Sequence, residues 1–282
     1  GEHALERWGD VLARQERVRV IAYYLPQYHP IPENDAWWGE GFTEWTNVRR
    51  AKPLFPGHRQ PRVPADLGYY DLRDPEAREA QAALAARHGL GGFCYYYYWF
   101  NGKRLLERPL QEVVARRSPD FPFCVCWANE NWTRRWDGQE DQVLIGQKHS
   151  PEDDRRLIES LIPLFEDARY IRVDGRPLVL LYRPELLPDV SRTTAIWRDA
   201  TRGAGLGELY LVAVQSYTAT LSALHLLGAA LLNTFDAVYN ELDLAIRALA
   251  DYVPQGVAWS AEWRSFFDGA QGIHLLGRGR PI

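Results

Sequence analysis

The segment FPFCVCWANENW, residues 121–132, decides the fold class. Its first part is an apolar run that is typical of a buried strand, because neither face of the run is polar. Its second part places two amides and one carboxylate directly behind that strand: Asn129, Glu130 and Asn131. An indole face such as that of Trp127, next to carboxylate and amide groups, suits a sugar, which has apolar C–H faces and a rim of hydroxyl groups. The segment therefore predicts a strand that ends in a carbohydrate site centred on Glu130.

The same apolar pattern repeats along the chain, and helical segments stand between the apolar runs. We expect strands at residues 18–24, 92–98, 123–127, 177–182 and 209–215. We expect helices at residues 74–88, 104–116, 151–165 and 190–204. The first of these helices has clear signals, since Asp74 is a capping residue, Pro75 suits the first helical position and Gly89 ends the pattern. Strands that are apolar on both faces and alternate with helices predict a parallel α/β fold.

Polar and aromatic residues follow nearly every predicted strand. These groups include Tyr24, Trp99, Asn129, Tyr182 and Gln215. Function gathered at the carboxyl ends of successive parallel strands is typical of a (β/α)8 TIM barrel. We predict that fold for a single domain over residues 1–282. No glycine-rich phosphate loop follows the first strand, so a dinucleotide-binding fold is disfavoured.

The composition is that of an ordinary globular protein and disfavours several classes of partner. The hydrophobic content is 46%, the charged content is 25% and the formal net charge is −4. A net negative charge gives no electrostatic footprint for nucleic acid or for an anionic membrane. No apolar run approaches the roughly 18 residues that a membrane span requires, and the first residues show no signal-peptide core. We expect a cytoplasmic chain without a membrane span or a nucleic-acid partner, whose oligomeric state the composition leaves open.

The three cysteines, Cys94, Cys124 and Cys126, fall on predicted interior strands. An odd number of cysteines on buried strands predicts free thiols in a reducing compartment. A zinc site would require more ligands with CxxC-like spacing. We therefore expect neither a metal ion nor another cofactor.

Five stretches of the chain are similar to one known family. They are IAYYLPQYHPIPENDAWWGEGFTEWTNV from Ile21, PADLGYYDLRDPEAREAQAALA from Pro64, GFCYYYYWFNGKRLLERPL from Gly92, FPFCVCWANENWTRRWDG from Phe121 and YIRVDGRPLVLLYRPELLPD from Tyr170. Through these stretches, residues 18–215 resemble the WbsX family of bacterial surface-polysaccharide loci, a relative of glycoside hydrolase family 99. The resemblance implies a family 99-like barrel that acts on α-linked glycans such as mannan, O-antigen or capsule chains. It favours hydrolysis over glycosyl transfer.

Two departures from the family pattern bear on mechanism. The family carries a histidine within the tyrosines of its second strand, where this chain has Tyr97. A phenol is not charged near pH 7, so a proton-transfer role at that position is expected to be lost. The family also ends with a strand that carries Asn-Glu-Trp-x-Glu-Gly, and in family 99 the two acids of this motif are the catalytic pair. Residues 216–282 contain no intact copy, so we expect the C-terminal strands to be divergent or incomplete.

Glycoside hydrolysis requires two carboxyl groups that flank the scissile bond. Glu130 is the first catalytic candidate, because it follows a strand among amides and indoles. Its alternative role is to bind sugar hydroxyls or to pair with Arg134. Glu44, in the first long loop, is the second candidate, with hydroxyl binding as its alternative. Glu262 is the third, as a displaced remnant of the missing motif.

The predicted substrate-binding residues are aromatic or polar side chains near strand ends. They are Tyr24, Gln27, His29, Trp38, Trp45, Tyr97, Tyr98, Trp99, Asn101, Trp127, Asn129, Asn131 and Tyr182. For some of them a structural role is an open alternative. His29 is a lone histidine, and Trp38 and Trp45 are able to hold the long loop in place without touching a ligand.

Three functional hypotheses follow from the sequence. The first is a glycoside hydrolase that acts on a bacterial oligo- or polysaccharide. The second is a glycan-binding pseudoenzyme that has lost its acid pair, as the missing terminal motif suggests. The third is a glycosyltransferase in polysaccharide biosynthesis, although the chain has no Asp-x-Asp-like metal motif and no nucleotide cradle.

Overall fold

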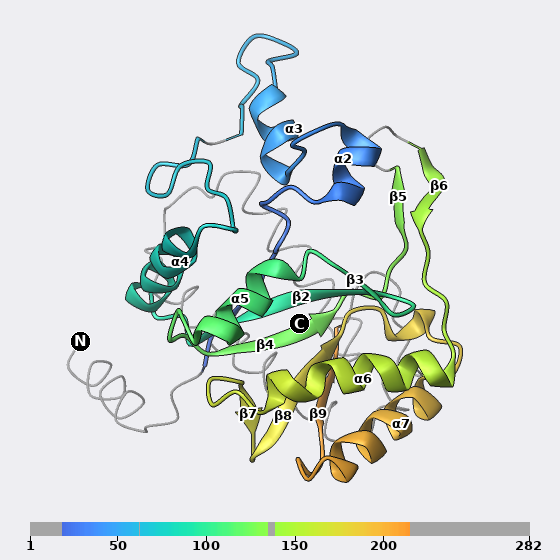
Figure 1. Ribbon diagram of the computed structural model, residues 1–282. Helices are drawn as coiled ribbons and strands as arrows, with labels where there is room; N and C mark the ends of the chain where they lie inside the picture. Colours follow the sequence, from blue (N-terminus) through green and yellow to red (C-terminus); the bar gives the residue numbers. More distant parts are fainter. Residues whose placement is uncertain (1–18, 62, 135–138, 215–282) are drawn as a thin grey trace, which may run out of the picture. The chain divides into compact units, whose positions relative to one another are not determined.

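The computed structural model describes residues 19–61, 63–134 and 139–214 (Figure 1). All of these residues belong to one compact unit. The expectations for residues 216–282, including Glu262, lie outside the described residues. The expectation of a single domain over the whole chain stays a prediction.

A parallel sheet forms the centre of the described structure. Its parallel strands are β1 (Ile21–Tyr24), β2 (Gly92–Phe100), β4 (Phe123–Trp127), β8 (Arg176–Leu181) and β9 (Tyr210–Ala213). Each strand pairs with the next one in this order, so neighbours in the sheet are also neighbours along the chain. All five strands lie where the sequence pattern predicts them.

Between each parallel strand and the next lies one helix that packs against the sheet. These helices are α4 (Pro75–Arg87), α5 (Arg108–Arg116), α6 (Pro151–Phe165) and α7 (Val190–Gly203). Three of them, α4, α6 and α7, start with a side-chain cap, since Asp74, Ser150 and Asp189 accept hydrogen bonds from backbone N–H groups of the first turn. Such a cap contributes about 1 kcal/mol to the stability of its helix.

The four helices cover the same face of the sheet (Figure 1). Tyr24 of β1 contacts α4, Tyr97 of β2 contacts α6, and Trp127 of β4 packs against α7. Sequential strands with helices on one face only are the arrangement of a (β/α)8 barrel, whereas a doubly wound sheet has helices on both faces. The fold is therefore the α/β barrel predicted from the sequence, and the described residues form an open run of its strands.

The strand register defines two faces of the sheet. The outer face, which the helices cover, carries Tyr24, Tyr95, Tyr97, Phe123, Val125, Trp127, Val179 and Leu181. The inner face carries the residues that alternate with them: Tyr23, Cys94, Tyr96, Tyr98, Cys124, Cys126 and Leu180. The cysteines are free and buried, as the sequence predicts.

The segment after β2 differs from the predicted helix at residues 104–116. β2 continues to Phe100 and turns back into a short antiparallel strand, β3 (Lys103–Leu105), before α5 begins at Arg108. The two turn residues have positive φ, 52° at Asn101 and 88° at Gly102. A two-residue hairpin turn requires this backbone conformation, which Asn-Gly adopts most readily. Asn-Gly is thus a hairpin signal that the helix prediction overlooked.

The remaining elements follow the carboxyl ends of the parallel strands, apart from the short strand β7 (Arg172–Val173) that leads into β8. They are α2 (Pro32–Trp38) and α3 (Glu44–Arg50) after β1, the antiparallel pair β5 (Trp132–Arg134) and β6 (Gln139–Ile145) after β4, and the 3-10 helix η2 (Pro184–Leu186) after β8. These insertions concentrate irregular structure at the end of the sheet where barrel enzymes carry their sites. In the described part of the chain, every helix is too short or too polar to cross a bilayer.

Candidate functional site

Arg183 forms ion pairs with Glu130 and Glu185 at the carboxyl ends of β4 and β8, and these three residues are here called the charged bracket. The Nη1 atom of Arg183 donates a hydrogen bond to Oε1 of Glu130 over 2.6 Å, and its Nε atom donates to Glu185. The side chain of Glu130 is 40% exposed, compared with 17% for Glu185 and 20% for Arg183. Glu130 is therefore the solvent-facing member of the bracket, and Arg183 is a charged partner that the sequence did not indicate. The pairing with Arg134 suggested by the sequence stays a prediction.

Asn129 holds the bracket in place. Its Nδ2 group donates to the backbone carbonyl of Arg183 over 2.7 Å, and its Oδ1 atom accepts from the backbone N–H of Arg183 over 2.8 Å. Asn129 is 1% exposed, so both amide bonds are made in the protein interior. The side chain acts as a rung between the ends of two parallel strands, which makes Asn129 a positioning residue; the sequence had suggested a substrate contact.

Glu44 approaches the same region from α3. The helix is capped by Thr43, whose hydroxyl accepts from the backbone N–H of Trp45 over 3.2 Å. The indole of Trp45 in turn donates to the backbone carbonyl of Tyr70 over 2.9 Å. Glu44 is half-buried on this anchored first turn, and burial raises the pKa of its carboxyl group. A carboxyl group with a raised pKa is suited to give up a proton near neutral pH.

The phenol of Tyr98 is under the electrostatic influence of both Glu44 and Glu130. Burial raises the pKa of its phenol well above the usual range, and the charges of Glu44 and Glu130 raise it further. Both charges therefore act on the same inner-face hydroxyl, although the two acids come from segments more than 80 residues apart. The catalytic roles of Glu44 and Glu130 stay predictions.

Aromatic rings line the inner face beside these acids. The ring of Tyr96 stacks on Tyr23 at 5.3 Å between centroids, and it lies 6.2 Å from Tyr98 and 5.7 Å from Tyr182. Trp132 of β5 closes the group with its ring 5.0 Å from Tyr98. Burial and the charge of Glu130 contribute to raising the pKa of Tyr96. These rings offer flat apolar surfaces next to a pair of carboxyl groups.

Three of these residues, Tyr23, Tyr96 and Trp132, were not among the predicted site residues, and neither was Arg183. The signal that finds the tyrosines is strand alternation. Once Tyr98 is placed on the inner face, Tyr96 must share that face. The parallel pairing of β1 with β2 then brings Tyr23 beside Cys94. No comparable pattern in the sequence points to Trp132.

Tyr24, Tyr97, Trp99 and Trp127 lie on the outer face, away from the inner-face rings. The hydroxyl of Tyr24 donates to Gln81 of α4 over 2.6 Å. Trp99 donates from its indole to Asp153 of α6 over 3.0 Å, and Trp127 packs against Trp197 of α7. Placement at the end of a strand suggested ligand contact for these residues. Alternation, however, directs every second side chain to the helices.

Tyr97, which replaces the histidine of the family pattern, lies on the outer face of the sheet. Its hydroxyl is 2.8 Å from the hydroxyl of Ser160 in α6, and the guanidinium of Arg104 lies 4.6 Å above its ring. A histidine here would meet the helix layer. The loss of a titratable group at residue 97 therefore removes nothing from the inner-face cluster.

The other predicted binding residues occupy loops with defined local contacts. Asn101 forms the β2–β3 turn, and the Oδ1 atom of Asn131 accepts from the backbone N–H of Gln147 over 2.7 Å. The ring of Trp38 packs near Phe42, and Trp45 anchors α3 as described above. These contacts account for the side chains structurally, as the alternatives proposed for the tryptophans allow. Gln27 is half-buried in the loop after β1.

His29 is buried in the loop that leads from β1 to α2. Burial lowers its pKa to about 4, although the nearby charge of Asp71 opposes the shift. The imidazole is therefore neutral at pH 7. A neutral, 1% exposed histidine fits the structural alternative stated for this residue.

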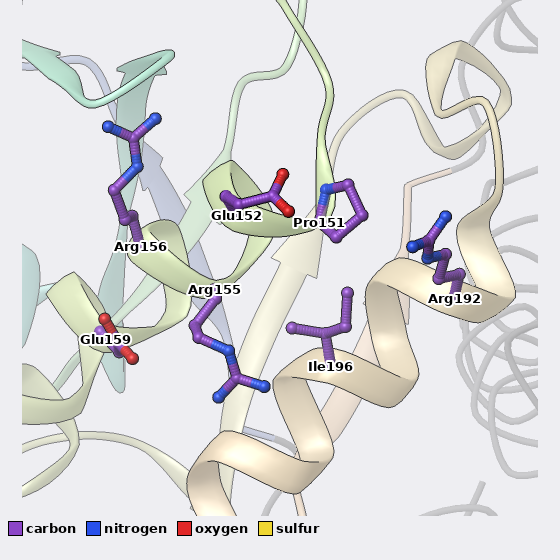
Figure 2. Close-up of a pocket in the computed structure, with 7 residues that line it drawn as sticks. All are labelled: Pro151, Glu152, Arg155, Arg156, Glu159, Arg192 and Ile196. Atoms are coloured by element: carbon purple, nitrogen blue, oxygen red, sulfur yellow. The ribbon is translucent and has the colours of Figure 1, made fainter.

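A separate groove of about 520 Å³ lies between α6 and α7 (Figure 2). Its lining consists of Pro151, Glu152, Arg155, Arg156, Glu159, Arg192 and Ile196. All of these residues belong to helices, on the far side of the sheet from the inner-face rings. The groove is therefore distinct from the cluster at the strand ends. Among the described residues there is no group of three or more potential metal ligands.

Comparison with known proteins places this geometry in a family. The family described as Glycosyltransferase WbsX matches residues 20–251. The protein WxcX from Xanthomonas campestris pv. campestris, described as uncharacterized, is 55% identical over 198 residues. That match covers 70% of this chain and 28% of WxcX, so the chain spans little more than a quarter of this relative.

Among solved structures, the chain is similar to the GH99 endo-alpha-mannosidase from Bacteroides thetaiotaomicron. The TM-score is 0.47 at 15% identity, and the alignment covers 74% of this chain and 58% of the mannosidase. A glycoside hydrolase-like protein gives a TM-score of 0.44 at 14% identity, with 70% of this chain and 51% of that protein covered. The match to the family over most of the sequence shows that the chain belongs to the WbsX family.

Proposed function

We propose that this chain binds an α-linked glycan of a bacterial surface polysaccharide at the carboxyl ends of β2, β4 and β8 and hydrolyses it. The observation that carries the proposal is the solvent-facing carboxylate of Glu130 at the strand ends that also carry the rings of Tyr96, Tyr98 and Tyr182. Glycoside hydrolysis requires a second carboxyl group across the scissile bond, and Glu44, whose charge acts on Tyr98, is the candidate.

The aromatic surface supports sugar binding. The rings of Tyr23, Tyr96 and Tyr182 present flat faces that match the C–H faces of a pyranose, while their hydroxyl groups match its polar rim. Burying one sugar face against such a ring stabilises the complex by an amount set by the apolar area, at about 25 cal/mol per Å². The tyrosines would therefore hold the sugar beside the two acids.

The two acids differ in a way that suits a division of roles. Burial raises the pKa of Glu44, which makes it the better proton donor to the glycosidic oxygen. Glu130 is more exposed and is held by Arg183, so it is suited to act on the opposite side of the sugar. There it would either take a proton from an attacking water molecule or attack the anomeric carbon itself. In both routes water is added across the bond. In the first route Glu44 ends deprotonated and Glu130 protonated, and proton exchange with solvent restores both; in the second, water hydrolyses the glycosyl–Glu130 ester and Glu44 takes back a proton from that water.

Glycosyl transfer is the second candidate function. The observation that favours it is the description of the matching family as a glycosyltransferase. A transferase would use the same aromatic surface for its acceptor but would require an activated sugar donor. The two functions therefore differ in whether water or a second sugar accepts the transferred glycosyl group.

The experiment is a mass-spectrometric screen for new reducing ends on a panel of α-linked bacterial glycans. The parent chain is compared with Glu130→Gln and Glu44→Gln, and Glu166→Gln serves as the matched control because Glu166 is exposed on the α6 side. Loss of a general acid or base slows turnover by about 10²- to 10⁴-fold. We expect both site variants to lose at least about 10²-fold and the control to keep the parent rate.

Other outcomes would redirect the assignment. Cleavage that survives in Glu130→Gln would remove Glu130 from the mechanism. Absence of cleavage, together with a glycan that raises the melting temperature, would identify a binding protein. Product formation only in the presence of nucleotide-activated sugars would establish the transferase.

A further inference from the structure

We propose that the glycan taken by this chain is acidic, and that its carboxylate groups are bound by the loop formed by residues 49–61, here called the basic loop. This inference rests on the proposed function, because it names the chemical class of the glycan that the site would receive. The basic loop leaves the carboxyl end of α3, the helix that carries Glu44 on its first turn.

The charge of the basic loop is opposite to that of the chain. Residues 45–65 contain no aspartate and no glutamate. The basic loop contains four cationic side chains: Arg49, Arg50, Lys52 and Arg59. The whole chain has a formal net charge of −4. A local cationic segment on an anionic protein creates a field that attracts anions to one place.

The cations of the basic loop are available to a ligand. Arg50, Lys52 and Arg59 are exposed, and none of them forms an ion pair with an acid in the described residues. Arg49 is also exposed, and its guanidinium is held 4.6 Å above the ring of Tyr69. A guanidinium in a fixed position is able to bind a carboxylate through two parallel hydrogen bonds.

The basic loop also contains a preformed aromatic platform. Residues 55–58, Phe-Pro-Gly-His, form a tight turn in which the backbone N–H of His58 donates to the carbonyl of Phe55 over 3.1 Å. Gly57 has a φ of 80°, as the third residue of a type II turn requires. The turn brings the rings of Phe55 and His58 into a parallel stack, 4.5 Å apart with an interplanar angle of 6°.

The turn also fixes the histidine, because its Nδ1 atom accepts from the backbone N–H of Leu54 over 3.1 Å. Phe55 nevertheless remains 59% exposed. An exposed ring that is already ordered loses little conformational entropy when a flat ligand stacks on it. The platform therefore supplies a surface for a sugar ring, and the cations around it supply partners for carboxylate groups.

The basic loop lies within reach of the site. The helix α3 has seven residues, so Glu44 and Arg50 are separated by about 10 Å along its axis. The indole of Trp45 fixes the start of this helix to the carbonyl of Tyr70, which follows the basic loop in the chain. A polysaccharide that runs from Glu44 along α3 would therefore meet the first cations of the basic loop at Arg49 and Arg50.

An anionic membrane would meet the same cations, and Leu54 is 84% exposed at the tip of the loop. The ordered stack of Phe55 on His58 favours the glycan, because insertion into lipid requires apolar side chains but no flat platform. The membrane is therefore an outcome that the experiment must separate.

The experiment measures binding of the full chain to acidic α-linked polysaccharides, each beside its methyl-esterified form. Polygalacturonate and its ester are the first pair, because the ester keeps the backbone and removes the charge. Three chains are compared: the parent, the triple variant Arg50→Gln/Lys52→Gln/Arg59→Gln, and the control triple variant Arg87→Gln/Arg116→Gln/Arg155→Gln. The control removes the same charge from exposed positions on α4, α5 and α6. Vesicles with and without phosphatidylserine test the membrane.

We expect the parent to bind the acidic form at least about tenfold more tightly than the ester, since each factor of ten corresponds to about 1.4 kcal/mol. The advantage should shrink as salt is raised, because the contacts lie at the surface. The triple variant should lose the advantage and the control should keep it. Phe55→Ala should weaken binding of both forms, since the platform contacts the sugar ring and not its charge.

Equal affinity for the acidic and esterified forms would overturn the inference and leave the proposed function intact. An equal loss in the control triple variant would also overturn it, because net charge alone would then explain the effect. Binding to phosphatidylserine vesicles without binding to acidic glycan would replace it with a membrane surface. Failure to bind any glycan would overturn both this inference and the proposed function.

Discussion

The outer and inner faces of the parallel sheet use the same residue types in opposite ways. On the outer face, Tyr97 and Trp99 direct their polar atoms to Ser160 and Asp153 of α6. On the inner face, the rings of Tyr96 and Tyr98 lie beside each other and within the field of Glu130. An aromatic side chain near the end of a strand is therefore a candidate for ligand binding only when it lies on the inner face of the sheet. Where a helix residue forms a hydrogen bond with the polar atom of the ring, the aromatic side chain has a structural role.

Removal of a buried outer-face ring should have the largest effect on stability. Trp127 is 1% exposed and packs against Trp197 at 5.7 Å between centroids. We expect Trp127→Ala to lower the free energy of unfolding by about 3–5 kcal/mol, as deletion of a buried aromatic ring does. Urea denaturation followed by tryptophan fluorescence and circular dichroism measures the loss. Trp38→Ala, at a half-buried loop position, is the control, and an equal loss there would contradict the assignment.

Removal of one tyrosine hydroxyl from each face of the sheet tests the roles of the two faces separately. Tyr97→Phe removes the contact with Ser160, so we expect it to cost about 1 kcal/mol of stability and to leave glycan binding unchanged. Tyr96→Phe removes an inner-face hydroxyl, so we expect near-parent stability and weaker glycan binding. Melting temperatures and calorimetric titration with the glycan found in the screen separate the two effects. The reverse pattern would mean that the faces have been assigned the wrong roles.

The smallest effect concerns the pH dependence contributed by Glu44. Burial raises the pKa of this carboxyl group above its ordinary value of 4.5 in the folded chain. The folded chain therefore binds this proton more tightly than the unfolded chain. The resulting stability is fully present below about pH 4.5 and is lost as the pH rises through the raised pKa.

We expect the melting temperature of the parent chain to fall relative to that of Glu44→Gln as the pH rises above 4.5. Thermal scans of both chains across the acidic range measure the difference. Parallel curves would show that the two states of Glu44 are solvated alike in the folded and unfolded chains, and Glu44 would lose its support as a proton donor.

Much of the fold was predictable because its signals are local. The helix α6 occupies residues 151–165 as expected, since Ser150 and Pro151 mark its start and its apolar side chains recur at helical spacing. The strand β4 likewise matches residues 123–127. The helices α2 and α3 were missed because each has only seven residues, which is too short for a period to emerge.

The site was less predictable because its decisive facts are not local. Four consecutive tyrosines give no contrast between the two faces of β2, so the sequence alone does not tell which of them meet the helices. The partnership of Glu130 with Arg183 joins residues 53 positions apart and depends on the adjacency of β4 and β8. The catalytic roles of Glu44 and Glu130, which were inferred from their neighbours in the sequence, stay predictions.

The hydrogen bond between the indole of Trp45 and the carbonyl of Tyr70 has a consequence for how this family diversifies. It closes the intervening segment at its base, so the length and content of that segment are able to change while Glu44 stays where it is. Each doubling of the length of such a loop lowers the stability of the fold by only about 0.6 kcal/mol. A lineage is thus free to change the surface formed by this segment without moving the side chain of Glu44.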